Sequence, residues 1–184
     1  IASQLTRDRK KYTRDLSAKK SQAQKLNQEI ERLLSREVKK KEEIDYTVSG
    51  KFEQNKGNLP WPIRGLVVEE FGVHNHPVYK NIQLPESNGI TISATGGSDV
   101  RCVFDGVVKQ ILIMPGYNQC VLVQHGEYFT FYCKLAKTGV KVGQQISAGE
   151  LIGTTEGTEK TASQFHFQIW KGTAKQNPTL WLRQ

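Results

Sequence analysis

Long apolar runs are absent from this sequence, and cysteine is scarce. No run approaches the ~18 consecutive apolar residues of a membrane-spanning helix, so we expect none. The three cysteines, Cys102, Cys120 and Cys133, do not fit the C-x-x-C spacing of a metal or redox site. They are either small buried hydrophobic residues or, in an oxidising compartment, one disulfide and one free thiol.

Glycine and proline are missing from residues 1–45, although the chain has 16 glycines and 6 prolines in all. Nothing in this segment breaks a helix, and apolar residues recur in it at heptad spacing. The seam residues that we predict are Leu16, Ala23, Leu26, Ile30 and Leu33. We expect 1–45 to be a coiled-coil helix, the C-terminal part of a longer coiled coil. Its seam must be buried against an antiparallel partner helix, a second copy of the chain or the globular domain.

The excess of positive charge is concentrated in the same segment. The whole chain has a formal charge of +8, and residues 1–45 hold 13 basic against 8 acidic side chains, a net of +5. Basic helices can bind nucleic acid or anionic lipid. Here the basic residues are scattered around the helix without an aromatic stripe. We therefore interpret them as the solvated face of a coiled coil and expect no nucleic-acid partner.

The pattern changes after residue 45. We interpret 46–58 as a linker, because β-branched and glycine residues interrupt the heptads, and Leu59-Pro60-Trp61-Pro62 cannot continue a helix. From there, short apolar runs punctuated by glycine predict strands. The fold class that we expect is mostly β with a long N-terminal helix. The domain over 59–184 should be an antiparallel β-sandwich with a groove across its central sheet.

Landmarks in this β-rich part resemble the lysostaphin/LytM family of zinc endopeptidases, which cut peptidoglycan cross-bridges. The resemblance rests on a series of stretches that follow one another in the order of the family, and four of them are the longest. They are KGNLPWPIRG (56–65), NGITISATGGSDVRCVFDGVV (88–108), VLVQHGEYFTFYCKLAK (121–137) and VKVGQQISAGELIGTT (140–155).

The zinc motifs of that family are degenerate here. The family binds its metal through H-x-x-x-D and through the last histidine of H-x-H. Ser87 and Thr91 stand at the first two ligand positions, and only His166 of the third is kept. Lys134 and Gln164 replace the two catalytic histidines. A catalytic zinc needs about three protein ligands, so the resemblance implies no metal, no cofactor and no catalysis.

Together with the helix, the domain resembles EnvC-type activators of cell-wall amidases. The resemblance implies a non-catalytic activator of periplasmic N-acetylmuramoyl-L-alanine amidases in cell division and daughter-cell separation. The groove lined by Ser87, Thr91, Lys134, Gln164 and His166 would capture a helix of the amidase. The coiled coil would dock on an FtsEX-type division complex. We add the hypothesis that the helix occupies the groove itself until then, because an open groove would activate the amidase at all times. We expect export to the periplasm, with a signal peptide outside this sequence because the chain opens on Ile1.

Two other functions stay open. One is an active zinc endopeptidase with rearranged ligands, and the other is a module that binds peptidoglycan stem peptides without cutting them. His74 and His76 lie two residues apart and would share one face of a strand, but no cysteine or acid completes a metal pattern there. Trp170, near the retained histidine, is either core packing or an aromatic anchor at the end of the groove.

Overall fold

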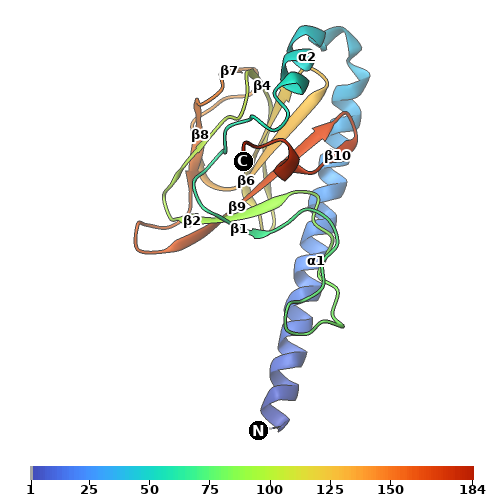
Figure 1. Cartoon of the computed structure of the whole chain (residues 1–184), viewed down its shortest axis with the longest axis vertical. Helices are drawn as coiled ribbons and strands as arrows, with labels where there is room; N and C mark the ends of the chain where they lie inside the picture. The colour runs from blue at the N-terminus through green and yellow to red at the C-terminus, as the bar shows by residue number, and fades with distance from the viewer. Residues whose placement is uncertain (1) are drawn as a thin grey trace.

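The computed structural model describes residues 2–184 and joins one long helix to a large β-sheet (Figure 1). Helix α1 (Ala2–Lys39) is followed by the 3-10 turn η1 (Lys41–Glu43) and the short helix α2 (Tyr46–Gln54). The N-terminal end of α1 projects well beyond the sheet, while its C-terminal half runs alongside the strands. The predicted N-terminal helix is confirmed over residues 2–39, and Ile1 lies outside the described residues. None of the helices in residues 2–184 has the length and apolar character that a membrane crossing requires.

Every strand pair in the sheet is antiparallel, and the order is β1-β2-β9-β6-β5-β4-β7. Strand β8 pairs with β6 and β3, and β10 pairs with β9, so the sheet branches at β6 and at β9. The mostly antiparallel β fold is therefore confirmed. The remaining elements are β1 (Leu66–Glu69), β2 (Ile90–Thr95), β3 (Asp99–Arg101), β4 (Gly106–Met114), β5 (Asn118–His125), β6 (Tyr128–Thr138), β7 (Gln145–Ile146), β8 (Leu151–Thr155), β9 (Ala162–Lys171), β10 (Ala174–Gln176) and the 3-10 turn η2 (Pro178–Leu180).

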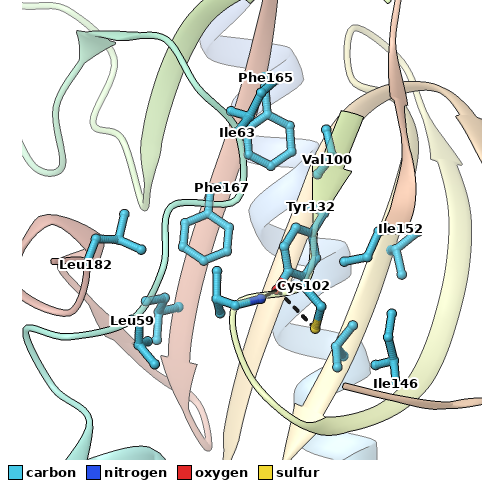
Figure 2. Close-up of a cluster of buried hydrophobic side chains, with 14 of the residues drawn as sticks. Leu59, Ile63, Val100, Cys102, Tyr132, Ile146, Ile152, Phe165, Phe167 and Leu182 are labelled. Atoms are coloured by element: carbon cyan, nitrogen blue, oxygen red, sulfur yellow. Dashed lines mark hydrogen bonds between the residues drawn. The ribbon is translucent and has the colours of Figure 1, made fainter. Parts of the chain in front are cut away.

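The central strands bury side chains on both faces of the sheet. On β6, Tyr132 belongs to a core with Phe165, Phe167 and Ile152, which Figure 2 shows. Its neighbour Phe131 belongs to a second cluster on the other face. This alternation is the period of two that a strand dictates. Because both faces are apolar, the sheet needs a cover on the second face.

Helix α1 provides that cover. Leu26, Ile30, Leu33 and Leu34 are buried in a cluster with Cys120, Leu122, Phe129, Phe131, Cys133 and Trp170, which we call the helix-side core. The seam predicted from the heptads is therefore buried against the globular domain, one of the three partners expected. Burying each of these leucine or isoleucine side chains contributes roughly 1.5–3 kcal/mol. Leu16 and Ala23, nearer the N-terminus, are half-buried.

The predicted linker over 46–58 contains a helix instead. The Asp45 carboxylate accepts hydrogen bonds from the backbone N–H groups of Thr47 and Val48, at 3.0 and 3.1 Å, and so caps α2. Phe52 is fully buried and stacks on Tyr128 with ring centroids 4.7 Å apart. Capping and this burial outweigh the weak helix propensity of the segment. Gly126, in the turn between β5 and β6, lets α2 pack closely against that turn, because a Cβ at this position would collide with the Ser49 hydroxyl.

Candidate functional site

Three neighbouring strands bring Thr91, His166 and Cys133 into one row. Thr91 on β2 pairs with His166 on β9, and His166 pairs with Cys133 on β6. Residues directly opposite one another in an antiparallel ladder point to the same face of the sheet. All three are buried. The row therefore lies on the face that α1 covers, beside the helix-side core.

His166 is held by a directed chain of hydrogen bonds. Trp170 Nε1, which can only donate, donates to Gln168 Oε1 at 2.9 Å. The Gln168 amide nitrogen therefore donates to His166 Nε2 at 2.9 Å, which leaves the proton on Nδ1. That Nδ1–H donates to Thr91 Oγ1 at 3.2 Å, and the Thr91 hydroxyl donates to Glu69 Oε1 at 3.4 Å. Both ring nitrogens are thus engaged.

The same surroundings keep His166 neutral. Burial, and to a smaller extent the charge of Lys134, lower its pKa to about 3. The neutral ring has one N–H and one lone pair, and the Gln168 amide already donates to that lone pair. His166 is therefore satisfied as a structural residue, and it holds no nitrogen ready for a metal.

Lys134 sits where β6 changes partners. Before it Cys133 pairs with β9, and after it Leu135 pairs with β8. Its backbone has a φ of 66°, the left-handed region that costs free energy for a residue with a side chain. Its N–H donates to Tyr117 O at 2.7 Å, and Nζ donates to Gln164 Oε1 at 3.3 Å. Burial lowers the pKa of this lysine, which the nearby Glu69 partly offsets.

Ser87 belongs to the loop that leads into β2. Its hydroxyl donates to Gly89 O at 2.8 Å, and its backbone exchanges two hydrogen bonds with Gly72. The hydroxyl therefore shapes the turn. Gln164, in contrast, is exposed at the start of β9.

All five positions predicted for the groove line one cavity of about 380 Å³. Helix α1 forms its opposite wall with Tyr12, Leu16, Lys19, Gln22, Ala23 and Asn27. The role of the five positions in binding a partner stays a prediction. Glu69, Tyr117 and Gln168 also line the site, and sequence reasoning missed them. Gln168 could have been found, because it lies two residues after His166 and so shares its face.

The residues present do not fit a catalytic zinc. Hydroxyl groups stand at two of the three ligand positions, and the ammonium group of Lys134 would repel a cation. Among the side chains that the structure describes, histidine, cysteine and acidic residues form no group of three or more that could hold a metal. His76, in the predicted His74–His76 pair, accepts hydrogen bonds from Val78 N and Tyr79 N instead. Its ring lies 4.9 Å from that of Tyr12, where the loop meets α1.

Trp170 is part of the helix-side core and is 2% exposed. Its indole packs beneath α1 and directs the hydrogen bonds that reach His166. The core-packing interpretation of Trp170 is therefore confirmed, and the indole reaches the cavity lining only through its hydrogen bond to Gln168.

Comparisons with known proteins place this geometry in context. The sequence model of peptidase family M23 matches residues 85–178. The cell division protein DipM of Caulobacter vibrioides is 32% identical over 117 residues, which cover 62% of this chain and 18% of DipM. The murein hydrolase activator NlpD of Escherichia coli is 31% identical over 67% of this chain and 31% of its own length. EnvC, a murein hydrolase activator of the same organism, is 28% identical over 69% of this chain and 29% of its own length. The chain thus spans less than a third of the length of these relatives.

Solved structures share the fold. Helicobacter pylori Csd3 matches with a TM-score of 0.57 and 25% identity, over 68% of this chain and 35% of Csd3. A zinc-containing peptidase from Vibrio cholerae matches with a TM-score of 0.56 and 21% identity, over 67% of this chain and 40% of that one. The fold is therefore shared with a zinc-containing peptidase.

Proposed function

The chain belongs to peptidase family M23, and from this premise we propose that it is a non-catalytic activator of N-acetylmuramoyl-L-alanine amidases. One observation carries the proposal. The family's metal position is filled by a closed hydrogen-bond chain from Trp170 through Gln168 and His166 to Thr91. A site built this way supports binding better than hydrolysis. The names of NlpD and EnvC, both murein hydrolase activators, support the same role.

The partner that we propose for the groove is a helix of the amidase. The strongest support is that a helix already fits there, because α1 rests its apolar side on the helix-side core and lines the cavity above His166. Helix-in-groove recognition uses such apolar anchors, with polar contacts at the edges. Lys134 and Gln164 would supply the polar edge, and Ser87 and Thr91 the floor.

Helix α1 and the amidase helix would then compete for one surface. Helix α1 is stabilised on the sheet by four buried side chains. Each contributes roughly 1.5–3 kcal/mol before the conformational entropy is counted. A ligand shifts such an equilibrium only by its differential affinity for the two states. We propose that an FtsEX-type division complex supplies this difference by binding the coiled coil, 1–45, and drawing it from the domain, 59–184. The protein would act in the periplasm after export.

A second candidate is a module that holds peptidoglycan without cutting it. The half-buried ammonium group of Lys134 faces the cavity and would suit the carboxylate of a stem peptide. The site residues argue against an active zinc endopeptidase, because hydroxyl groups stand at two of the three ligand positions. The binding module differs from the activator in one respect, since it needs no amidase to bind isolated sacculi.

Release of dye from labelled sacculi tests the proposal. Purified protein, amidase alone and the two together are compared, and we expect rapid release only from the mixture. A protein with Lys134, Gln164 and Thr91 all altered serves as the groove control and should activate poorly. Release by the protein alone would contradict the proposal. Sedimentation with sacculi but no stimulation of amidase would favour the binding module.

A further inference from the structure

The sheet separates the three cysteines. Cys102 lies in the core with Tyr132 and Phe167, and the Tyr132 hydroxyl donates to its sulfur at 3.6 Å (Figure 2). Cys120 and Cys133 belong to the helix-side core on the opposite face. All three are free thiols and buried. Cys120 and Cys133 can therefore meet, whereas neither can reach Cys102.

Strand register brings Cys120 and Cys133 next to each other at a bulge between β5 and β6. On β5 and β6, Val121 pairs with Tyr132 and Leu122 with Phe131. The register then shifts between Gln119 and Val121, so Cys120 lies at a bulge and faces both Cys133 and Lys134. Opposed residues of an antiparallel pair have Cα atoms about 4.5–5.5 Å apart, inside the roughly 4.4–6.8 Å that a disulfide spans. Burial raises the pKa of Cys133, and the neighbouring Cys120 side chain adds to that rise.

Helix α1 shields this pair. Cys120 and Cys133 share their cluster with Leu26 and Ile30, and both have 0% exposure. Thiol exchange needs a thiolate and an open path to it, and a buried thiol beneath a packed helix has neither. The reactivity of the pair therefore depends on whether α1 rests on the sheet.

We propose that Cys120 and Cys133 form a redox-active pair that closes to a cross-strand disulfide when α1 leaves the sheet. The inference deepens the proposed function and rests on the same helix displacement. While α1 is away, the disulfide would tie β5 to β6 in the floor that the helix has vacated. The oxidant is a disulfide of low molecular weight or of another protein.

The chemistry consists of two exchange steps. One cysteine loses its proton to water, and its thiolate attacks a sulfur of the external disulfide. That S–S bond breaks, a mixed disulfide forms, and the first thiolate leaves and is protonated. The second cysteine, as its thiolate, then attacks the protein sulfur of the mixed disulfide. The Cys120–Cys133 bond forms and the second external thiol is released. The protein loses two electrons, and the external disulfide gains them.

The test treats the whole purified protein with oxidised glutathione, without amidase. Wild type is compared with Ile30→Glu, which places a charge in the helix-side core, and with Ile30→Leu as the matched control. Free thiols are alkylated at each time point. Both cysteines lie in one tryptic fragment between Lys109 and Lys134, so a second cleavage after Glu127 yields two pieces that only the disulfide holds together. We expect disulfide closure in Ile30→Glu to be at least about tenfold faster than in the other two proteins.

Cys102 distinguishes helix release from unfolding, because it lies in the other core. In Ile30→Glu it should stay protected from alkylation while Cys120 and Cys133 react. If Ile30→Glu also exposes Cys102, the comparison is repeated with Ile30→Ala, which loosens the helix without burying a charge. Three results would overturn the inference. One is that Ile30→Glu and wild type form the disulfide at equal rates while Cys102 stays protected. The others are mixed disulfides with glutathione that never become a Cys120–Cys133 bond, and a disulfide that includes Cys102. No amidase is present in this experiment. Its result is therefore independent of whether the protein activates an amidase, and the two proposals can fail separately.

Discussion

The indole N–H of Trp170 donates to the side-chain carbonyl of Gln168, and this single bond fixes the orientation of every group as far as Glu69. Because an indole can only donate, the Gln168 amide must donate to His166, which must in turn donate to Thr91. The site is thus a one-directional chain that ends on a carboxylate. It is preorganised as a structural network, and His166 is one of its internal links.

Zinc should not be part of this protein. Purified and dialysed protein should contain far less than one zinc per chain by elemental analysis, because hydroxyl groups stand at two ligand positions. Chelation with EDTA should leave the melting temperature unchanged, since no metal contributes to folding. Stoichiometric zinc that survives dialysis, or cleavage of cross-linked peptidoglycan by the protein alone, would contradict this.

Replacing Ile30 with glutamate should raise amidase activation. The side chain is fully buried, and a charge there costs several kcal/mol, on the order expected for an unpaired buried group, unless the helix lifts away. Dye release in the presence of amidase measures the effect. Leu5→Glu is the matched control, because Leu5 lies on the same helix and is 61% exposed. If Ile30→Glu stimulates the amidase no more than wild type does, the proposed competition between α1 and the amidase is wrong.

Charge reversal at Lys134 should weaken amidase binding without unfolding the domain. Its ammonium group lines the cavity beside Gln164, and Lys134→Glu would add a second negative charge near Glu69. We expect about a tenfold or greater loss of affinity, which is ~1.4 kcal/mol. Lys134→Gly separates the effect of the charge from that of the backbone. Because glycine adopts the left-handed φ without strain, this variant should be more thermally stable. It lacks the ammonium group, so it should still bind the amidase more weakly. Wild-type affinity in both variants would exclude Lys134 from the interface.

Two buried histidines should make the protein lose stability as the pH falls. Burial lowers the pKa of His125 to about 4, and burial with the charge of Lys134 lowers that of His166 to about 3. Unfolded, both protonate near the ordinary value of 6.5, so the unfolded state binds more protons below that pH. The free energy of unfolding should therefore be fully present above pH 6.5 and fall as the pH drops toward 4 and then 3.

Urea unfolding at a series of pH values measures this loss, which amounts to several kcal/mol at ~1.4 kcal/mol per pKa unit. His125→Gln should flatten the dependence. His74→Gln, at an exposed position, is the matched control. A free energy of unfolding that does not change between neutral and acidic pH would show that the two histidines titrate normally.

The sequence predicted the helix seam and the groove positions for different reasons. Heptad spacing is a local pattern, so Leu26 and Ile30 could be assigned without the fold. Ser87 and Lys134 could be placed only through a family resemblance, because they come from distant segments. The capping of α2 by Asp45 was missed, since Gly50 and the β-branched residues mask a helix that depends on the burial of Phe52. The chain from Trp170 to Thr91 could not be predicted, because it depends on side-chain orientation across two strands.

The apolar second face of the sheet has a consequence for how the protein is made. Without the helix, this face would expose an apolar patch that is prone to aggregation, formed by Leu122, Phe129, Phe131 and Trp170. Synthesis runs from the N-terminus, so α1 exists before any strand. The helix can therefore pack against each hydrophobic strand as it forms, which reduces aggregation of the nascent domain before any partner is present.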